Sequence, residues 1–351
     1  MSRRIKLEDL AQHLGLSKFS VSRALSGKPG VSTQTRDAVI RLARELNYAH
    51  SGISEPSEER VIQLIIPSAD AIKSSFWVEV IGGAEEEARL LGYRLATEVL
   101  GEKSMPGPLD ASVAGIILAG RRSRGVLEPF IRLPIPKVLI GHPRPMEMID
   151  SCQQANFDSG FAVGDLFGQL GHRSVAYFTD APDDEGRNLR LAGLNEAMRK
   201  HGGQVVVHAF DDEREARFMA LDAFSVDPLP TAFACATDLV AMTIAWGLNE
   251  LGLKIPDHIS LVGSNDSHAA AQLGLRLTTV RQPMREIGEV AVQTLHWRIN
   301  HARADSRPRR TLLTPELIAR ATHAAPNLRE LEAALRRVDI GHQRMLEAKT
   351  L

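Results

Sequence analysis

The sequence has only two cysteines, Cys152 and Cys235, in 351 residues. Because they are few and far apart along the chain, neither a disulfide framework nor a cysteine-rich zinc site is expected. No apolar run approaches the roughly 20 residues that span a bilayer. The first ten residues, MSRRIKLEDL, are basic and lack the apolar core of a secretory signal. We therefore expect a cytoplasmic protein with no membrane partner.

Signatures of catalysis are also missing. The sequence contains no P-loop, no GxSxG elbow and no cluster with metal-ligand spacing. The acidic triplet at 183–185 is typical of a solvated loop rather than of a metal cage. We therefore predict that the protein is not an enzyme and that it uses neither a cofactor nor a metal.

What is present is an ordinary globular composition, with 44% hydrophobic and 24% charged residues. A chain of this length can build two or three domains with sizeable cores. The net charge of −1 is unevenly distributed: residues 1–50 hold nine Lys or Arg against four Asp or Glu, so they carry +5 and the remainder carries −6. A small basic head on a mildly acidic body indicates a nucleic-acid reader attached to a second function.

The stretch 7–25, LEDLAQHLGLSKFSVSRAL, predicts two short helices joined by a tight turn at Gly15. Ser17 can cap the second helix with its side-chain oxygen. Apolar residues would share the buried faces: Leu7, Leu10, Ala11, Leu14, Val21, Ala24 and Leu25. The outer face of the second helix carries side chains that can reach a DNA major groove: Lys18, Phe19, Ser22 and Arg23. The spacing favours a helix-turn-helix, and an ordinary helical hairpin is the alternative.

Residues 1–49 form a small DNA-binding domain in this interpretation. After the loop SGKPGVSTQT, Ser32 can cap a third helix that runs through Asn47. The next stretch, 50–60, is polar, acidic and turn-rich, which predicts a linker.

From residue 61 to residue 325 the pattern alternates between apolar strands and amphipathic helices. We expect strands at VIQLII, RLATEV, AGIILAG, PKVLIG, SVAYF, QVVVHAF, TAFACA and ISLVG. Helices are expected at 76–93, 187–201, 212–224 and 238–251, and a short strand with a long helix at 278–299. Alternation in two blocks predicts an α/β core with two lobes, each a doubly wound parallel sheet. Ligands of such folds bind at the carboxyl ends of the strands, so the cleft between the lobes is the expected effector site.

The tail, 326–351, predicts a helix with an apolar seam. Leu328, Leu331, Leu335 and Val338 step by 3, 4 and 3, as in a heptad repeat. Such a seam can associate with a second copy of the chain or dock on its own lobe, and two heptads leave both interpretations open.

The stretch LEDLAQHLGLSKFSVSRALSGKPGVSTQTRDAVIRLARELNY resembles the N-terminal domain of the LacI/GalR family of bacterial transcriptional regulators. Later segments follow the order of the same family: VIQLIIP, AGIILAG, LGHRSVAYF, RLAGLNEAM, ATDLVAM, GLKIPDHISLVG and LTTVRQP. The resemblance covers roughly residues 5–322. It implies a helix-turn-helix headpiece, a linker that often forms a hinge helix, and a periplasmic-binding-protein-like core.

The same resemblance implies how such a protein works. Members of the family are usually homodimers that bind a palindromic operator in double-stranded DNA, often as repressors. A small effector, often a sugar, controls their affinity for the operator. The apolar seam of the tail could join two such dimers into a tetramer.

Carried over by position, the resemblance places four residues of the second helix against base edges: Lys18, Phe19, Ser22 and Arg23. Arg23 can read guanine through two hydrogen bonds, worth about 1–3 kcal/mol of discrimination. Phe19 can offer only an apolar contact, for example to a thymine methyl group, or it can fold back onto the first helix. The phosphate-contacting places of the family are taken by Ser17, Ser32, Thr35 and Tyr48.

In the core, the resemblance points to six effector-binding residues: Phe76, Trp77, Asp158, Arg190, Thr237 and Asn265. An aromatic side chain can cover the C–H face of a sugar, while Asp158 and Arg190 can bind its hydroxyl groups. Each has a structural alternative, namely a core tryptophan, a helix-capping aspartate and an arginine in a salt bridge between the lobes.

Two departures from the family pattern lead to hypotheses. The hinge normally contains an apolar wedge, but 50–60 holds Glu55, Glu58 and Glu59 and has only Ile53 near the wedge position. Three carboxylates beside phosphates are unfavourable, so we expect an atypical hinge that bends operator DNA weakly. At the effector site, Asn265 stands where the family has aspartate, which favours an effector that carries an acid or a phosphate.

Overall fold

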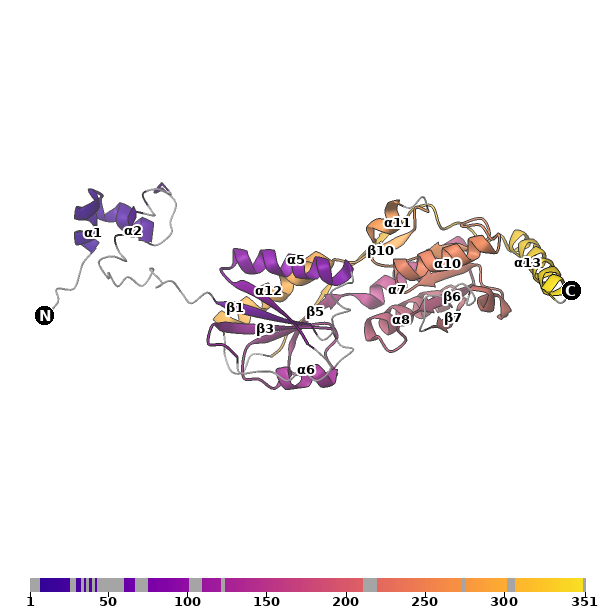
Figure 1. Ribbon diagram of the computed structural model, residues 1–351, viewed down its shortest axis with the longest axis horizontal. Helices are drawn as coiled ribbons and strands as arrows, with labels where there is room; N and C mark the ends of the chain where they lie inside the picture. The colour runs from indigo at the N-terminus through magenta and orange to yellow at the C-terminus, as the bar shows by residue number, and fades with distance from the viewer. Residues whose placement is uncertain are drawn as a thin grey trace. The chain divides into compact units, whose positions relative to one another are not determined.

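The computed structural model divides into two compact units, Met1–Arg60 and Val61–Leu351. The residues it describes are 7–25, 30–32, 35, 38–39, 42, 60–66, 75–100, 109–120, 124–210, 220–272, 275–301 and 307–349. Figure 1 shows their helices and strands in chain order. Within these ranges, no helix is long and apolar enough to cross a membrane.

In the first unit, α1 (Leu7–Leu14) and α2 (Lys18–Leu25) form the predicted helix-turn-helix. Gly15 has a φ of +62°, a conformation that L side chains rarely adopt, and it ends α1. Ser17 caps α2, because its Oγ accepts a hydrogen bond from the Ser20 N–H at 3.0 Å. The described residues 35, 38, 39 and 42 are helical, as expected for a third helix. The helices share one core: Leu10, Ala11, Val21, Ala24, Leu25 and Val39.

The second unit starts with a lobe built on parallel strands in the order β11-β5-β4-β3-β1-β2. The strands are β1 (Val61–Ile66), β2 (Arg94–Val99), β3 (Val113–Ala119), β4 (Lys137–Ile140), β5 (Asp150–Gln154) and β11 (Arg310–Leu313). One face of this sheet packs against two helices, α5 (Ser75–Leu90) and α12 (Met284–Asn300).

Alternate residues of β1 face opposite sides of this sheet. Ile62, Leu64 and Ile66 belong to the cluster that packs under α5 and α12. Ile65 belongs to the cluster on the other side, which includes Phe130 of α6 (Arg124–Ile131). Both faces of the sheet are therefore covered, which explains why VIQLII is an almost continuous apolar run.

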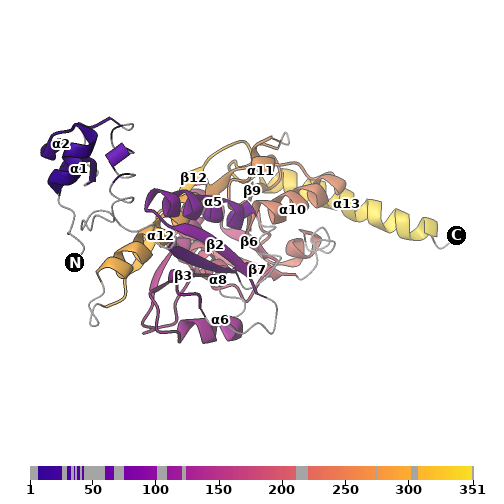
Figure 2. The ribbon, with the colours of Figure 1, turned by 60° about the vertical axis from the view of Figure 1, so that its left-hand side comes forward.

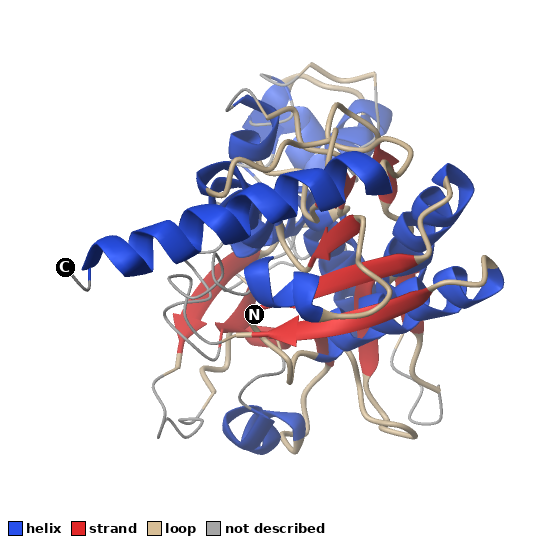
Figure 3. Cartoon of the chain, turned by 90° about the vertical axis from the view of Figure 1, so that its right-hand side faces the viewer, coloured by secondary structure: helices blue, strands red, loops and turns tan. Residues whose placement is uncertain are grey.

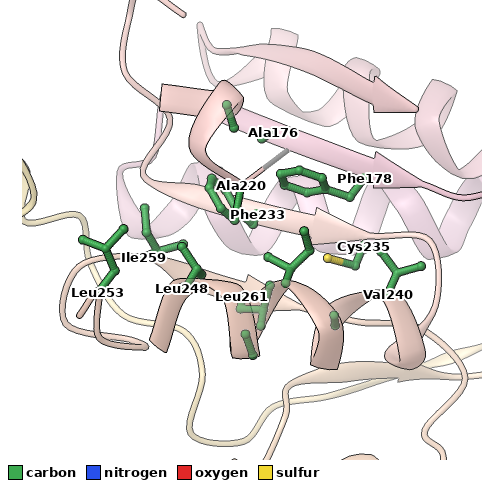
Figure 4. Close-up of a cluster of buried hydrophobic side chains, with 14 of the residues drawn as sticks. Ala176, Phe178, Ala220, Phe233, Cys235, Val240, Leu248, Leu253, Ile259 and Leu261 are labelled. Carbon is green, nitrogen blue, oxygen red and sulfur yellow. The ribbon is translucent and has the colours of Figure 1, made fainter. Parts of the chain in front are cut away.

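The second lobe is a parallel sheet in the order β7-β6-β8-β9. Its strands are β6 (Ser174–Thr179), β7 (Gln204–Ala209), β8 (Ala232–Cys235) and β9 (Ser260–Val262). One face packs beneath α10 (Asp238–Glu250), with Phe178 and Phe233 in a T-shaped contact at 5.0 Å between ring centroids (Figure 4). The other face, with Tyr177, packs on α7 (Asn156–Leu170) and α8 (Glu185–Lys200).

Short elements complete the second lobe. They are the 3-10 helix η1 (Ala223–Ser225) and α11 (His268–Gln272). The helix expected at 212–224 lies largely outside the described residues, of which 220–222 are helical.

The chain passes between the lobes at three places. It leaves the first lobe after β5, returns between β10 (Thr279–Arg281) and α12, and leaves again between β11 and β12 (Glu316–Ile318). β10 and β12 pair antiparallel. The two lobes are confirmed, but they are not two consecutive blocks of sequence, because α12 and β11 come late in the chain and complete the first lobe.

Glycines bring two pairs of helices close together. A Cβ added at Gly193 of α8 would overlap the carbonyl oxygen of Phe157 in α7. A Cβ added at Gly288 of α12 would likewise overlap the carbonyl oxygen of Val80 in α5. Protein interiors are close-packed, so a larger residue at either position would push the two helices apart.

The C-terminal helix α13 (Leu328–Lys349) docks on the second lobe through its first turns. Leu331 is fully buried in the cluster beneath α10, and Leu335 packs against the same cluster. Leu328 is 47% exposed. Figure 3 shows α13 as the long helix that ends at the C-terminus. Part of the apolar seam is thus used within the chain, and association through the rest of it stays a prediction.

Candidate nucleic-acid interface and effector cleft

The exposed side of α2 carries the residues that were predicted to meet base edges. Phe19 is 68% exposed and does not fold back onto α1. The guanidinium of Arg23 lies over its ring, with Cζ 5.2 Å from the ring centroid. Lys18 forms an ion pair with Glu8 of α1, and Ser22 is half-buried. An apolar ring beside a cationic donor suits a thymine methyl group next to a guanine.

The predicted phosphate-contacting hydroxyls lie at helix N-termini. Ser17 caps α2, and Ser32 Oγ accepts a hydrogen bond from the Thr35 N–H at 3.1 Å. The hydroxyl oxygens of Ser32 and Thr35 are 2.7 Å apart. The N–H groups and the dipole of a helix N-terminus attract anions, so these positions suit phosphate binding. Tyr48 lies outside the described residues.

Aromatic and polar residues meet in a cavity of about 110 Å³ between the lobes. Phe76 and Trp77, at the start of α5, line one side and contact each other edge to face at 5.1 Å. Across the cavity, Asn156 Nδ2 lies 3.0 Å from His142 Nε2. Asn156 Oδ1 and Gln153 Oε1 are buried acceptors with no hydrogen-bond partner in the described part of the chain. Such acceptors are rare in folded proteins, so a ligand that donates hydrogen bonds is expected here.

Arg190, from α8, reaches the carboxyl ends of β8 and β9. Its Nη1 donates to the carbonyl oxygen of Ala236 at 2.6 Å and to Ser264 Oγ at 2.9 Å. Its Nε is buried and has no partner among the described residues. Burial lowers the pKa of this guanidinium. Both partners of Nη1 belong to the second lobe, so these bonds do not tie the two lobes together.

Gln282 lies on a crossing between the lobes and shares a hydrogen-bond acceptor, Ser264 Oγ, with Arg190. Its Nε2 donates to Ser264 Oγ at 3.2 Å and to Ser159 Oγ at 3.3 Å. Gln282 Oε1 is a further buried acceptor without a partner in the described residues. The same side chain lines a larger neighbouring cavity, of about 510 Å³, that also contains Asn265.

Asn265 is held in an unusual backbone turn at the edge of this larger cavity. Asn265 and Asp266 have φ values of +113° and +52°, which cost free energy for residues other than glycine. The Asn265 N–H donates to the carbonyl oxygen of Val280 at 2.8 Å, and Asp266 accepts a hydrogen bond from Arg281 Nε at 2.8 Å. The crossing segment therefore fixes the position of Asn265.

The two remaining predicted effector residues lie apart from these contacts. Thr237 caps α10, because its Oγ1 accepts a hydrogen bond from the Val240 N–H at 3.2 Å. Asp158 is exposed in the first turn of α7 and is not among the residues that line the cavities at Trp77, Arg190 and Asn265. The structure thus brings Phe76 and Trp77 together in one cavity and places Arg190 and Asn265 in neighbouring ones.

Sequence reasoning missed Gln153, Asn156 and Gln282. The available signal was the polar run QQAN at 153–156, between a strand and a helix. The carboxyl end of a parallel strand is where ligands of this kind of fold bind.

A helix-turn-helix unit joined to a two-lobed α/β unit with a polar cleft defines a DNA-binding protein under the control of a ligand. Two family models match the chain. Residues 6–51 match "Bacterial regulatory proteins, lacI family", and residues 165–323 match "Periplasmic binding protein-like domain". The chain belongs to the lacI family of bacterial regulatory proteins.

Individual relatives agree with this assignment. The chain is 25% identical over 305 residues to the ribose operon repressor of Haemophilus influenzae, which covers 84% of this chain and 92% of the relative. A solved complex of the transcriptional regulator CelR with cellobiose is 22% identical, with a TM-score of 0.63 over 91% of this chain and 100% of that one. The lac repressor dimer bound to operator and the anti-inducer ONPF is 20% identical, with a TM-score of 0.65 over 92% and 100%. The protein is a transcriptional repressor with an effector-binding domain and not an enzyme, as the sequence predicted.

Proposed function

We propose that this protein represses transcription as a homodimer on a palindromic operator, and that a sugar or sugar acid in the interlobe cleft controls its affinity for DNA. The observation that carries the proposal is a set of buried polar atoms from both lobes that have no hydrogen-bond partner among the described residues: Gln153 Oε1, Asn156 Oδ1 and Arg190 Nε. A hydroxyl group both donates and accepts. A polyhydroxylated ligand in the cavity at Trp77 can therefore donate to the two acceptors, and one that extends into the neighbouring cavity can accept from Arg190.

The aromatic residues support the same class of ligand. Trp77 is half-buried at the cavity, beside Phe76. An aromatic face covers the C–H groups of a sugar ring while the polar atoms bind its hydroxyls. The solved CelR complex contains a sugar, cellobiose, in a protein of similar fold.

A ligand that contacts both lobes favours the arrangement in which they are close, because only that arrangement makes all of its contacts. The three crossings then act as the hinge. In a dimer, closure changes the spacing of the two headpieces and so the fit to the operator. A coupling of about 1–3 kcal/mol would change operator affinity roughly 5- to 150-fold.

An apolar stripe on α10 supports the homodimer. Leu239 and Trp246, seven positions apart, are 55% and 60% exposed, with Met242 half-buried between them. Residues seven apart share one face of a helix, and exposed tryptophan and leucine are typical of an interface core. We expect Trp246→Glu to yield monomers in analytical ultracentrifugation and to lose affinity for a palindrome. A Trp246→Glu variant that stays dimeric would contradict this interface.

The hypothesis about the charge of the effector concerns Asn265, because an amide tolerates an acid on the ligand better than aspartate would. Arg281, in the same cavity, is ion-paired with Asp266 and Glu316, so the hypothesis depends on Asn265 alone. We expect wild-type protein to bind sugar acids more tightly than the matching neutral sugars in calorimetry, and Asn265→Asp to reverse the order. Tighter binding of neutral sugars by the wild type would refute the hypothesis.

The proposal of weak operator bending concerns the linker 50–60, of which residues 50–59 lie outside the described part of the chain. It depends on Glu55, Glu58 and Glu59 beside phosphates. A DNA-bending assay should show little central kink. A strong kink that Ile53→Ala abolishes would contradict the proposal.

The proposed function as a whole is tested in two steps. Selection from a random DNA library with the full-length protein should return two inverted half-sites. A thermal-shift screen of sugars, sugar acids and nucleosides should then return a compound that changes affinity for the selected DNA. Recovery of a single half-site would overturn the dimeric, palindromic interpretation.

A further inference from the structure

We propose that the first lobe carries a second DNA-contacting surface, separate from the headpiece, which binds phosphates of the duplex beside the operator. We call it the basic edge and define it as Arg298, His301, Arg307, Arg309 and Arg310. The proposal rests on the proposed function only in requiring that the protein binds DNA.

The basic edge lies where the strands of the first lobe begin. Because β1, β3, β4, β5 and β11 are parallel, they all start at the same side of the sheet. The end of α12 reaches that side, since Arg298 binds Asp150, the first residue of β5, through two hydrogen bonds of 2.7 Å. Figure 2 shows α12 extending past the starts of the strands. Arg310 is the first residue of β11.

Positive charge is concentrated there although the body of the protein is acidic. The described residues of 296–310 include four arginines, Arg298, Arg307, Arg309 and Arg310, and no Asp or Glu. Three more basic residues precede or begin strands on the same side: Arg60, Arg94 and Lys137. A local basic surface on an otherwise acidic domain is the pattern expected of a polyanion site.

Four acidic side chains of the first lobe have partners among the described residues. Asp150 is buried against Arg298, and its Oδ1 also accepts a hydrogen bond from the Arg309 N–H at 2.7 Å. Glu147 accepts a hydrogen bond from the Arg144 N–H at 2.7 Å. Two others have partners of their own: Asp110 with the Ser112 N–H at 2.8 Å and Glu128 with Arg132 at 3.3 Å.

Aromatic stacking holds the exposed arginine in place. The guanidinium of Arg309 lies over the ring of Trp297, with Cζ 3.7 Å from the centroid. His301 stacks on the same tryptophan at 5.3 Å between centroids. Arg310 Nη2 donates to the carbonyl oxygen of Arg144 at 3.1 Å. Side chains ordered in advance lose less conformational entropy when they bind, so this cluster is suited to a ligand.

The linker from the headpiece enters the second unit on this side of the lobe. Val61 begins β1 there, and the predicted linker 50–60 directly precedes it. Eleven residues span at most about 40 Å, so the end of the headpiece at residue 49 stays within about 40 Å of Val61. Arg307, Arg309 and Arg310 are exposed, and three cations on one surface can bind several phosphates of a duplex, whereas one small anion would occupy only one or two of them.

The test compares two triple variants of the full-length protein that lose the same charge. Arg307→Ala/Arg309→Ala/Arg310→Ala removes the basic edge. Arg199→Ala/Lys200→Ala/Arg336→Ala removes three exposed cations from the second lobe. Binding of a labelled duplex of arbitrary sequence, about four helical turns long, is measured by fluorescence anisotropy between about 50 and 200 mM salt. Thermal melting checks that each variant is folded.

We expect the basic-edge variant to have a shallower slope of log K against log salt, by about 0.9 for each phosphate that it no longer binds. Its affinity at about 0.1 M salt should fall by roughly eightfold for each such phosphate, as that slope implies. The second-lobe variant should match the wild type within about twofold. Arg307→Lys/Arg309→Lys/Arg310→Lys keeps the charge and should keep most of the slope.

Equal slopes of log K against log salt for the two alanine variants would overturn the proposal. The basic edge would then be a candidate surface for an acidic protein partner. If the wild type bound no duplex at all, the DNA-binding function would fail together with this proposal. A wild type that binds duplex, with no weakening in the basic-edge variant, would refute the second surface alone.

Discussion

Replacing Arg190 by methionine distinguishes an effector-binding arginine from a structural one. The guanidinium of Arg190 makes two charge-assisted hydrogen bonds, to the Ala236 carbonyl oxygen and to Ser264 Oγ, of about 1.5–3 kcal/mol each. Against them stands the cost of burying a cation whose Nε has no partner among the described residues, which is several kcal/mol. The two effects nearly cancel, so we expect the free energy of unfolding of Arg190→Met to lie within about 1 kcal/mol of the wild type.

The effect on ligand binding should be large by comparison. A ligand at about 100 times its Kd stabilises the folded protein by about 2.7 kcal/mol, which raises the melting temperature by roughly 5–10 °C for a domain of about 150–250 residues. In a panel of sugars, sugar acids and nucleosides, each compound that shifts the wild type should leave Arg190→Met unshifted. Arg199→Met, an exposed change on the same helix, should shift normally.

Two results would refute this reasoning. A melting temperature of Arg190→Met that is lower than that of the wild type by more than about 10 °C would make Arg190 a structural residue. A ligand-induced shift equal to that of the wild type would show that Arg190 does not contact the effector.

Three further predictions concern buried groups. Burial lowers the pKa of His172 from 6.5 to about 4, so the folded state favours the neutral ring. The neutral ring contributes roughly 3 kcal/mol to the free energy of unfolding above about pH 6.5, and this contribution is lost as the pH falls toward about 4. Denaturant unfolding at about pH 7 and pH 4 should therefore show a larger loss of stability at low pH for the wild type than for His172→Gln. Arg298→Met leaves the Asp150 carboxylate buried without its cation and should cost about 3–5 kcal/mol in urea unfolding, so a loss below about 1 kcal/mol would contradict the pairing. Gly288→Ala forces a methyl group onto the Val80 carbonyl oxygen and should cost about 1–3 kcal/mol by the same assay.

Elements with a regular apolar pattern could be predicted from the sequence. VIQLII, SVAYF and TAFACA are buried on both faces, so burial and composition agree. The strand β5 could not be predicted, because DSCQQ is polar and is stabilised by a distant partner, Arg298 on Asp150. Helix α7 was missed because Gly160, Gly164 and Gly168 weaken a helical pattern, although the first of them permits the close approach of α8.

The two candidate sites also differed in how far the sequence could predict them. The DNA-reading face depends on spacing within α2 alone, so residues such as Phe19 and Arg23 could be placed on it from the sequence. The cleft is assembled from segments far apart in the chain, at 76–77, 153–156, 190 and 282. Only the structure shows which of their polar atoms are buried without a partner in the described part of the chain.

The most direct test of the proposed control by an effector is the affinity of the full-length protein for its selected operator. It is measured by anisotropy with and without the compound found in the thermal-shift screen. We predict a change of roughly 5- to 150-fold for the wild type and no change for Arg190→Met. A compound that binds the cleft and leaves the operator affinity of the wild type unaltered would contradict the coupling between cleft and headpiece.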